Sequence, residues 1–147
     1  MKKFLSIALA LLMVCVMLPM VALADGSVTT AEALKTAVEN GGEVTLGADI
    51  TASIVIPADK TVTLKLNGHT LTNEANNDTI YVTLGGTLVV DGSGKVDNIS
   101  HACAAIFNNG TTTLNGGTFD RSKEASTDGS SAAGNSYYTI LNHGQTT

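Results

Sequence analysis

Most of the chain alternates apolar and polar residues with a period of two, which is the pattern of a half-buried β-strand. The alternation is clearest in residues 61–66, where Val62 and Leu64 would lie on one face and the residues between them on the other. Residues 54–56 form a shorter apolar segment, and we expect it to end at Pro57, which has no N–H to donate to a neighbouring strand. The pattern predicts an all-β protein built from short strands.

One amphipathic helix is expected before the strands, over residues 30–40, where apolar residues recur at helical spacing. Thr29 and Glu32 match a capping box with Thr29 as the N-cap, and residues 40–42 tolerate the positive φ that ends a helix. A helix this short is marginally stable by itself in water. We therefore expect its apolar face to dock on the strands.

Residues 1–24 have the features of a secretory signal peptide. A short basic head precedes an unbroken apolar run at residues 7–18, and Ala22 and Ala24 provide small residues at the spacing that a signal peptidase recognises. A transmembrane helix is the alternative, but it needs about 20 apolar residues. We expect cleavage before Asp25, and a secreted or cell-surface protein that is not inserted in the membrane afterwards.

An internal repeat follows the helix. Asn-Gly or Asp-Gly dipeptides recur at intervals of 24 residues, at positions 67, 91 and 115, each after an alternating strand. Three segments that begin with isoleucine open the later repeats: 80–82, 106–108 and 140–142. Each repeat is therefore expected to hold a short strand, a turn, a Thr-rich strand, an Asn/Asp-Gly corner, another short strand and a variable loop.

No single repeat can bury its own apolar face, so the repeats are expected to stack as coils with parallel strands paired between them. Stacking at the observed interval would place Leu64 over Leu88 and Leu88 over Thr112. A meander of β-hairpins is the alternative, because Asn-Gly between apolar segments also marks hairpins. Hairpins predict spacings of roughly 8–12 residues, so the longer constant interval favours coils.

Two segments resemble a known group of proteins: KTVTLKLNGHTL at residues 60–71 and GTTTLNGGTF at residues 110–119. They are similar to right-handed parallel β-helix proteins of the pectin-lyase-like superfamily, of the repeat-rich secreted or surface type found in Gram-positive anaerobic bacteria. The resemblance implies a right-handed parallel β-helix (a solenoid) over residues 43–147, with residues 25–42 as an N-terminal capping helix segment. The repeat stops within a strand at the C-terminus, so we expect an incomplete last coil and a truncated chain. The resemblance does not indicate an activity, because proteins with many different functions share this scaffold.

Charge and composition exclude several functions. Lys and Arg number 8 against 13 Asp and Glu, so the chain is acidic and has no basic stripe for nucleic acid. Cys103 would be the only cysteine after cleavage, which rules out an internal disulfide. The three histidines (69, 101 and 143) do not have metal-ligand spacing, so we expect neither a metal nor another cofactor.

The candidate binding residues lie in the loops that follow the third strand of each repeat. These loops vary most in length, and insertions at one corner of a repeat protein often mark its binding face. The longest loop ends in Tyr137-Tyr138, and adjacent tyrosines can stack on sugar rings. The alternative is that one tyrosine packs back on the coil.

Asp97 and Asp120 follow the same strand of successive repeats, so we expect them to lie one coil apart. Paired carboxylates can hydrolyse glycosides, and Arg121 beside them would suit a polysaccharide lyase. Solvated surface carboxylates are the alternative. We find no converging set of acids and bases, so we assign both aspartates to the candidate binding surface and name no catalytic residue.

The functional hypothesis is a secreted, non-catalytic surface or adhesin-like module that binds an extracellular polysaccharide or host glycan through the stacked loops. The alternative is the N-terminal fragment of a polysaccharide lyase or glycoside hydrolase. A structural spacer that holds other domains away from the cell wall is a third possibility.

Overall fold

A computed structural model describes residues 26–100, 102–123 and 138–147. The predicted signal peptide, residues 1–24, and one candidate residue, Tyr137, lie outside this part of the chain. Within it, no helix is both long and apolar enough to span a membrane.

Three sheets make up the fold, and all their strand pairings are parallel. Sheet A contains, in spatial order, β1 (Ser27–Val28), β2 (Gly42–Leu46), β5 (Thr61–Lys65), β8 (Thr87–Asp91), β11 (Thr111–Leu114) and β14 (Gln145–Thr146). Sheet B contains β3 (Ile50–Thr51), β6 (Thr70–Asn73), β9 (Lys95–Asn98) and β12 (Thr118–Asp120). Sheet C contains β4 (Ile54–Ile56), β7 (Ile80–Val82), β10 (Ile106–Asn108) and β13 (Ile140–Asn142).

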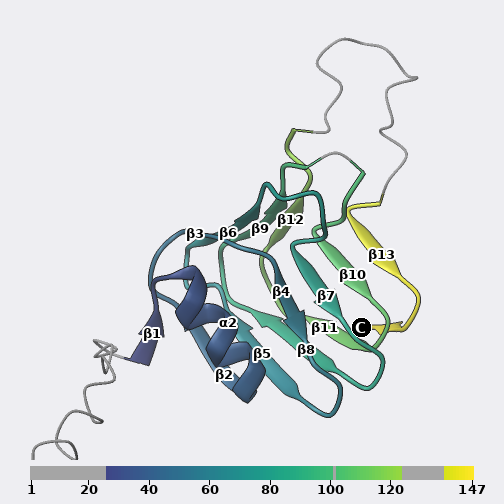
Figure 1. Ribbon diagram of the computed structural model, residues 1–147, viewed down its shortest axis with the longest axis horizontal. Helices are drawn as coiled ribbons and strands as arrows, with labels where there is room; N and C mark the ends of the chain where they lie inside the picture. The colour runs from purple at the N-terminus through teal and green to yellow at the C-terminus, as the bar shows by residue number, and fades with distance from the viewer. Residues whose placement is uncertain (1–25, 101, 124–137) are drawn as a thin grey trace, which may run out of the picture.

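The chain passes from sheet A to sheet B to sheet C and then starts again, so each coil adds one strand to every sheet. Figure 1 shows these coils side by side, with β1 and the helix at one end of the stack and β13 at the other. The parallel stacking predicted from the repeat is confirmed, and a meander of antiparallel hairpins is excluded. Mostly β structure in three parallel sheets is consistent with a parallel β-helix.

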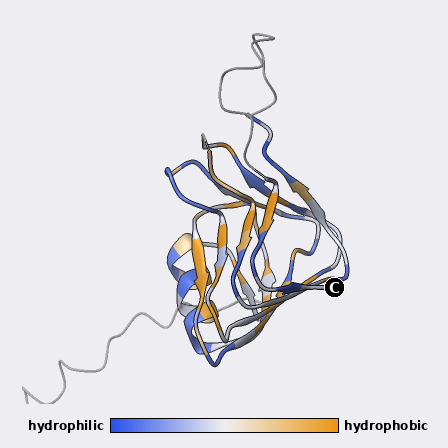
Figure 2. Cartoon of the chain, turned by 90° about the vertical axis from the view of Figure 1, so that its right-hand side faces the viewer, coloured by the Kyte–Doolittle hydropathy of each residue, from blue (hydrophilic) through white to orange (hydrophobic). Residues whose placement is uncertain are grey.

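Alternate residues of each strand point into the space between the sheets, and stacking aligns them in columns. One column runs from Val62 to Leu88 to Thr112, all fully buried. Figure 2 shows hydrophobic residues gathered along the strands, while the connecting turns and loops are mostly hydrophilic. The core therefore runs the length of the stack, and each coil buries its apolar face against the next.

The predicted register between the second and third coils was wrong by two residues. Leu64 lies beside Val90, not Leu88. The sheet C strands β4, β7 and β10 begin 26 residues apart. Turns of four residues then precede both β5 and β8, so their interval is also 26, whereas the two-residue turn before β11 shortens the next interval to 24. Matching the Asn-Gly and Asp-Gly dipeptides failed because Asp91 still belongs to its strand, where it pairs with Lys65. Because the register shift is an even number of residues, the residues predicted to point inward do point inward.

Thr112 is the polar member of its column. It is fully buried, and in the described residues its Oγ1 has no hydrogen-bond partner. A buried hydroxyl without a partner costs about 1–3 kcal/mol. We therefore expect Thr112→Val, which keeps the shape of the side chain, to raise the free energy of unfolding by about 1 kcal/mol. Urea denaturation measures this change, and destabilisation by Thr112→Val would contradict the placement of Thr112 in the core.

The helix α2 (Ala31–Asn40) covers the first coil. Leu34 and Val38 are buried, and the helix packs against β2 and β4. Its N-cap is Thr30, whose Oγ1 accepts a hydrogen bond from the N–H of Ala33 at 3.2 Å. The predicted capping box with Thr29 as N-cap was therefore wrong by one residue. Thr29 follows β1, which pairs with β2 and holds the chain extended up to the start of the helix.

Candidate functional site

Sheet C presents a column of apolar and aromatic side chains on its outward face. The middle residues of its strands lie in register, one from each coil, and we call them the outer column: Val55, Tyr81, Phe107 and Leu141. The residues on either side of each middle residue point inward, and in β4, β7 and β10 those neighbours are buried. The outer column therefore lies on the surface because the strands alternate.

The aromatic members of the outer column contact each other. The ring centroids of Tyr81 and Phe107 are 5.2 Å apart, and the imidazole of His143 meets the Phe107 ring edge-on at the same distance. Asn109 Nδ2 donates a hydrogen bond to the Tyr81 hydroxyl at 2.8 Å. These contacts hold the rings in place, and polar atoms of Asn109, Tyr81 and His143 lie beside the apolar surface.

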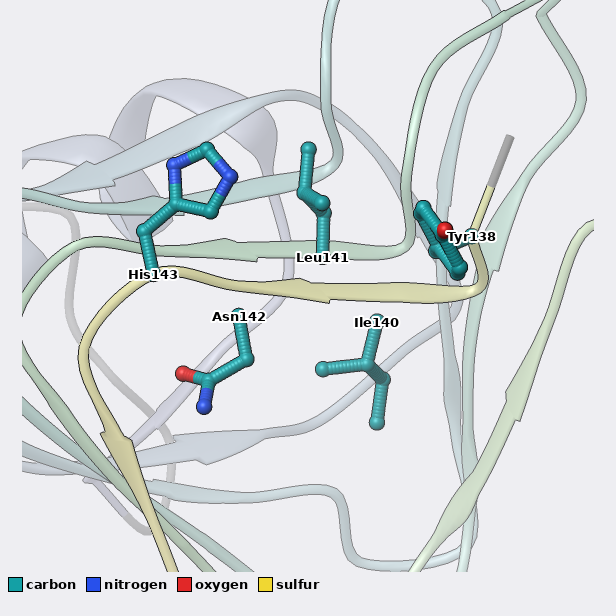
Figure 3. Close-up of a pocket in the computed structure, with 5 residues that line it drawn as sticks. All are labelled: Tyr138, Ile140, Leu141, Asn142 and His143. Atoms are coloured by element: carbon teal, nitrogen blue, oxygen red, sulfur yellow. The ribbon is translucent and has the colours of Figure 1, made fainter. Parts of the chain in front are cut away.

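Tyr138 extends this surface at the last coil. Its side chain is 64% exposed, and it lines an open hollow together with residues 140–143 of β13 and the following turn. Figure 3 shows Tyr138, Leu141 and His143 on one side of β13, opposite Ile140 and Asn142. The tyrosine predicted as a binding residue therefore lies on the same side of its strand as the last member of the outer column.

The loops after β6 and β9 both connect sheet B to sheet C, so their described residues lie at one corner of the stack, as predicted (Figure 1). Buried asparagines hold them together. Asn98 Nδ2 donates to the carbonyl oxygen of Asn77 in the preceding loop at 2.9 Å and to that of Ala104 in its own loop at 3.0 Å. The loops are thus joined across coils.

Asp97 and Asp120 are register neighbours on β9 and β12, which confirms that they lie one coil apart. Both bind the same ammonium group: Lys95 Nζ is 2.9 Å from Asp97 Oδ2 and 3.1 Å from Asp120 Oδ2. Asp97 is buried and also accepts hydrogen bonds from the Oγ of Ser122 at 2.6 Å and from its N–H at 3.0 Å. The alternative of a solvated carboxylate is therefore wrong for Asp97.

The cluster of Lys95, Asp97 and Asp120 holds the start of the loop after β12 against the outward face of sheet B. Arg121 is buried, and its Nε donates to the carbonyl oxygen of Cys103 in the loop of the preceding coil at 2.7 Å. Ser122, the next residue, is held by Asp97. Asp97 and Arg121 thus make contacts within the protein that join neighbouring coils.

Electrostatics at Asp97 favour the ionised carboxylate. Burial raises the pKa of Asp97, but the hydrogen bonds from Ser122 and Lys95 and the charge of Lys95 outweigh burial, so the pKa falls below its ordinary value of 3.8. The hydrogen bond to Asp97 raises the pKa of Lys95 above 10.5, although burial opposes it. A general acid needs a raised carboxyl pKa, which Asp97 does not have.

The lowered pKa of Asp97 makes stability depend on pH. A carboxyl whose pKa is lower in the folded state stabilises that state above its unfolded pKa, and the contribution is lost as the pH falls through the folded pKa. We expect Asp97→Asn to have a lower melting temperature than the unaltered protein at pH 7, and the difference to shrink as the pH falls below about 4. Melting curves at pH 3–7 test this. A constant difference would show that the charge of Asp97 does not contribute.

Tyr81 and Phe107 were not predicted as site residues, although the sequence contained the signal. The segments at 80–82 and 106–108 were recognised as strands that open a repeat. In a strand with buried first and third residues, the middle residue must point outward. An aromatic residue at that position in successive repeats therefore indicates a surface column.

Comparison of the chain with protein-family models, curated proteins and solved structures gives no significant match. The candidate site is therefore interpreted from its own residues. In the described part of the chain, no group of three or more His, Cys, Asp or Glu side chains is placed to hold a metal ion.

Proposed function

We propose that this protein is an exported, non-catalytic surface module of the parallel β-helix type, and that it binds glycans through the outer column and Tyr138. The observation that carries the proposal is the ring contact between Tyr81 and Phe107 on the outward face of sheet C. Aromatic side chains with polar groups beside them suit sugars, which have apolar C–H faces and hydroxyl edges.

The proposed fold type rests on two supports. The three parallel sheets have one strand per coil, as a parallel β-helix requires. The residues at 60–71 and 110–119 resemble the pectin-lyase-like superfamily, whose coils are right-handed. Predicted export, repeated coils and an exposed aromatic surface together support an adhesin-like role.

Glycan binding is tested with an array of extracellular polysaccharides and host glycans, probed with the exported protein. We expect binding to at least one glycan class, and a loss of at least about tenfold in affinity for Phe107→Ala and for Tyr138→Ala, which corresponds to about 1.4 kcal/mol. Val89→Ala is the matched control, because Val89 is a half-buried outward residue on sheet A. Unchanged binding in both site variants would overturn the assignment of this surface.

The same preparation of exported protein also tests export. We expect the N-terminal sequence of the exported protein to begin at Asp25, and Ala24→Leu, which places a large residue at the cleavage position, to leave the precursor uncleaved. Uncleaved wild-type protein held in the membrane would contradict the proposed location.

A polysaccharide lyase or glycoside hydrolase is the second candidate, and the in-register pair of Asp97 and Asp120 is what favours it. Assays on acidic and neutral polysaccharides for unsaturated or reducing ends test it. Turnover that Asp120→Asn abolishes would favour the enzyme, whereas absence of turnover in a protein that still binds glycans favours the module.

A further inference from the structure

We infer that the outer column binds an unbranched, uncharged polysaccharide whose chain runs along the stack, with successive sugar rings over successive coils. This inference rests on the proposed function and names its ligand class. It follows from three features of the outward face of sheet C: its periodicity, its lack of charge and the placement of its polar atoms.

Periodicity is the first feature. Neighbouring strands lie about 4.8 Å apart, and the rings of Tyr81 and Phe107 are 5.2 Å apart. Each of the four strands contributes one member of the outer column, in register from Val55 to Leu141. In an extended polysaccharide each sugar advances by about the width of one ring, which is close to this repeat. A chain that crosses the strands can therefore place one sugar over each member of the outer column.

Lack of charge is the second feature. The strands of sheet C contain no Asp, Glu, Lys or Arg. Charged residues are present in the strands of the other two sheets: Glu43, Lys65 and Asp91 in sheet A, and Lys95, Asp97 and Asp120 in sheet B. The whole chain has a net charge of −5, which disfavours anionic polymers. Charge complementarity therefore selects a neutral chain over a uronate or sulfated one.

Placement of polar atoms is the third feature. The Tyr81 hydroxyl accepts its hydrogen bond from Asn109, so its own proton can be donated to a sugar oxygen. His143 adds ring nitrogens beside Phe107. Tyr81 lies within β7, and Asn109 and His143 lie one residue after β10 and β13. Hydroxyls along one edge of a sugar chain could meet them in succession.

The length of the oligosaccharide is the variable that tests the inference. We would titrate the exported protein by calorimetry with cello-, xylo- and N-acetylated chito-oligosaccharides of one to six sugars, and with oligogalacturonates of the same lengths. We expect the affinity for one neutral series to rise at least about tenfold from the disaccharide to the tetrasaccharide and to level off beyond four sugars, since four strands carry the outer column. Oligogalacturonates are expected to bind more weakly at every length.

Tyr81 variants locate the chain on the column. Tyr81→Ala interrupts the column in the middle, so we expect it to remove the gain between the disaccharide and the tetrasaccharide. Tyr81→Phe keeps the ring and should keep the dependence on length. Val89→Ala on sheet A is the control, and circular dichroism confirms that each variant is folded.

The possible results separate this inference from the proposed function. Neutral oligosaccharides that bind with no dependence on length, or oligogalacturonates that bind more tightly, would overturn the inference and leave glycan binding standing. Absence of binding to every oligosaccharide, together with a negative glycan array, would overturn both.

Discussion

Leu64→Ala is expected to lower the free energy of unfolding by about 2–5 kcal/mol, the usual cost of truncating a buried leucine. Leu64 is fully buried in the middle of sheet A, between Val44 on one side and Val90 on the other. Its removal leaves a cavity that the strands cannot close, because backbone hydrogen bonds to both neighbours fix their spacing. Denaturation in urea, followed by circular dichroism, gives the change.

The control for Leu64→Ala is Val89→Ala in the adjacent strand. Val89 is apolar but points outward, so we expect its truncation to cost about 0.5 kcal/mol or less. A larger loss for Val89→Ala than for Leu64→Ala would mean that the inward and outward faces of sheet A have been exchanged, which would contradict the alternation on which both the core and the outer column depend.

Asn98→Leu is expected to lower the free energy of unfolding by at least about 3 kcal/mol, because each buried polar group left without a partner costs about 1–3 kcal/mol. Asn98 is fully buried, and its side chain makes three hydrogen bonds within the described part of the chain. Its Nδ2 donates to the carbonyl oxygens of Asn77 and Ala104, and its Oδ1 accepts from the N–H of Ser100 at 2.8 Å. Leucine has a similar size but satisfies none of these backbone groups.

Hydrogen exchange in the two loops that Asn98 contacts provides a second measurement for Asn98→Leu. Hydrogen exchange should accelerate in residues 74–79 and 99–105, since Asn98 joins both loops to the sheets. The matched control is Asn76→Leu, at an exposed position in the first of these loops, with an expected change of about 0.5 kcal/mol or less. A neutral effect of Asn98→Leu would show that the loops are held in place by other contacts.

Local patterns in the sequence predicted the elements well because they depend on short-range physics. In a strand, successive side chains point to opposite faces, so a period of two identifies the buried residues. The Ile-x-x segments form the strands of sheet C. Pro57 follows the last residue of β4, as expected for a residue that cannot donate to a neighbouring strand. Gly41 ends the helix with φ +80°, a conformation that glycine adopts without strain.

Properties that depend on several coils at once were harder to predict. The register between β5 and β8 follows the 26-residue interval between β4 and β7 and not the 24-residue interval between the Asn-Gly and Asp-Gly corners. The burial of Asp97 depends on Ser122, a loop residue 25 positions away. The site was only partly predicted: Tyr138 was found from its loop, whereas Tyr81 and Phe107 were missed although the Ile-x-x segments already place them in register.

The central claim is that coil stacking aligns one outward residue from each coil of sheet C into a continuous column. Cross-strand backbone NOEs in the exported protein test it most directly. We predict NOEs that join the backbone at Val55 to that at Tyr81, Tyr81 to Phe107, and Phe107 to Leu141, with the strands in parallel order. Antiparallel cross-strand patterns, or connections displaced by two residues, would contradict the account.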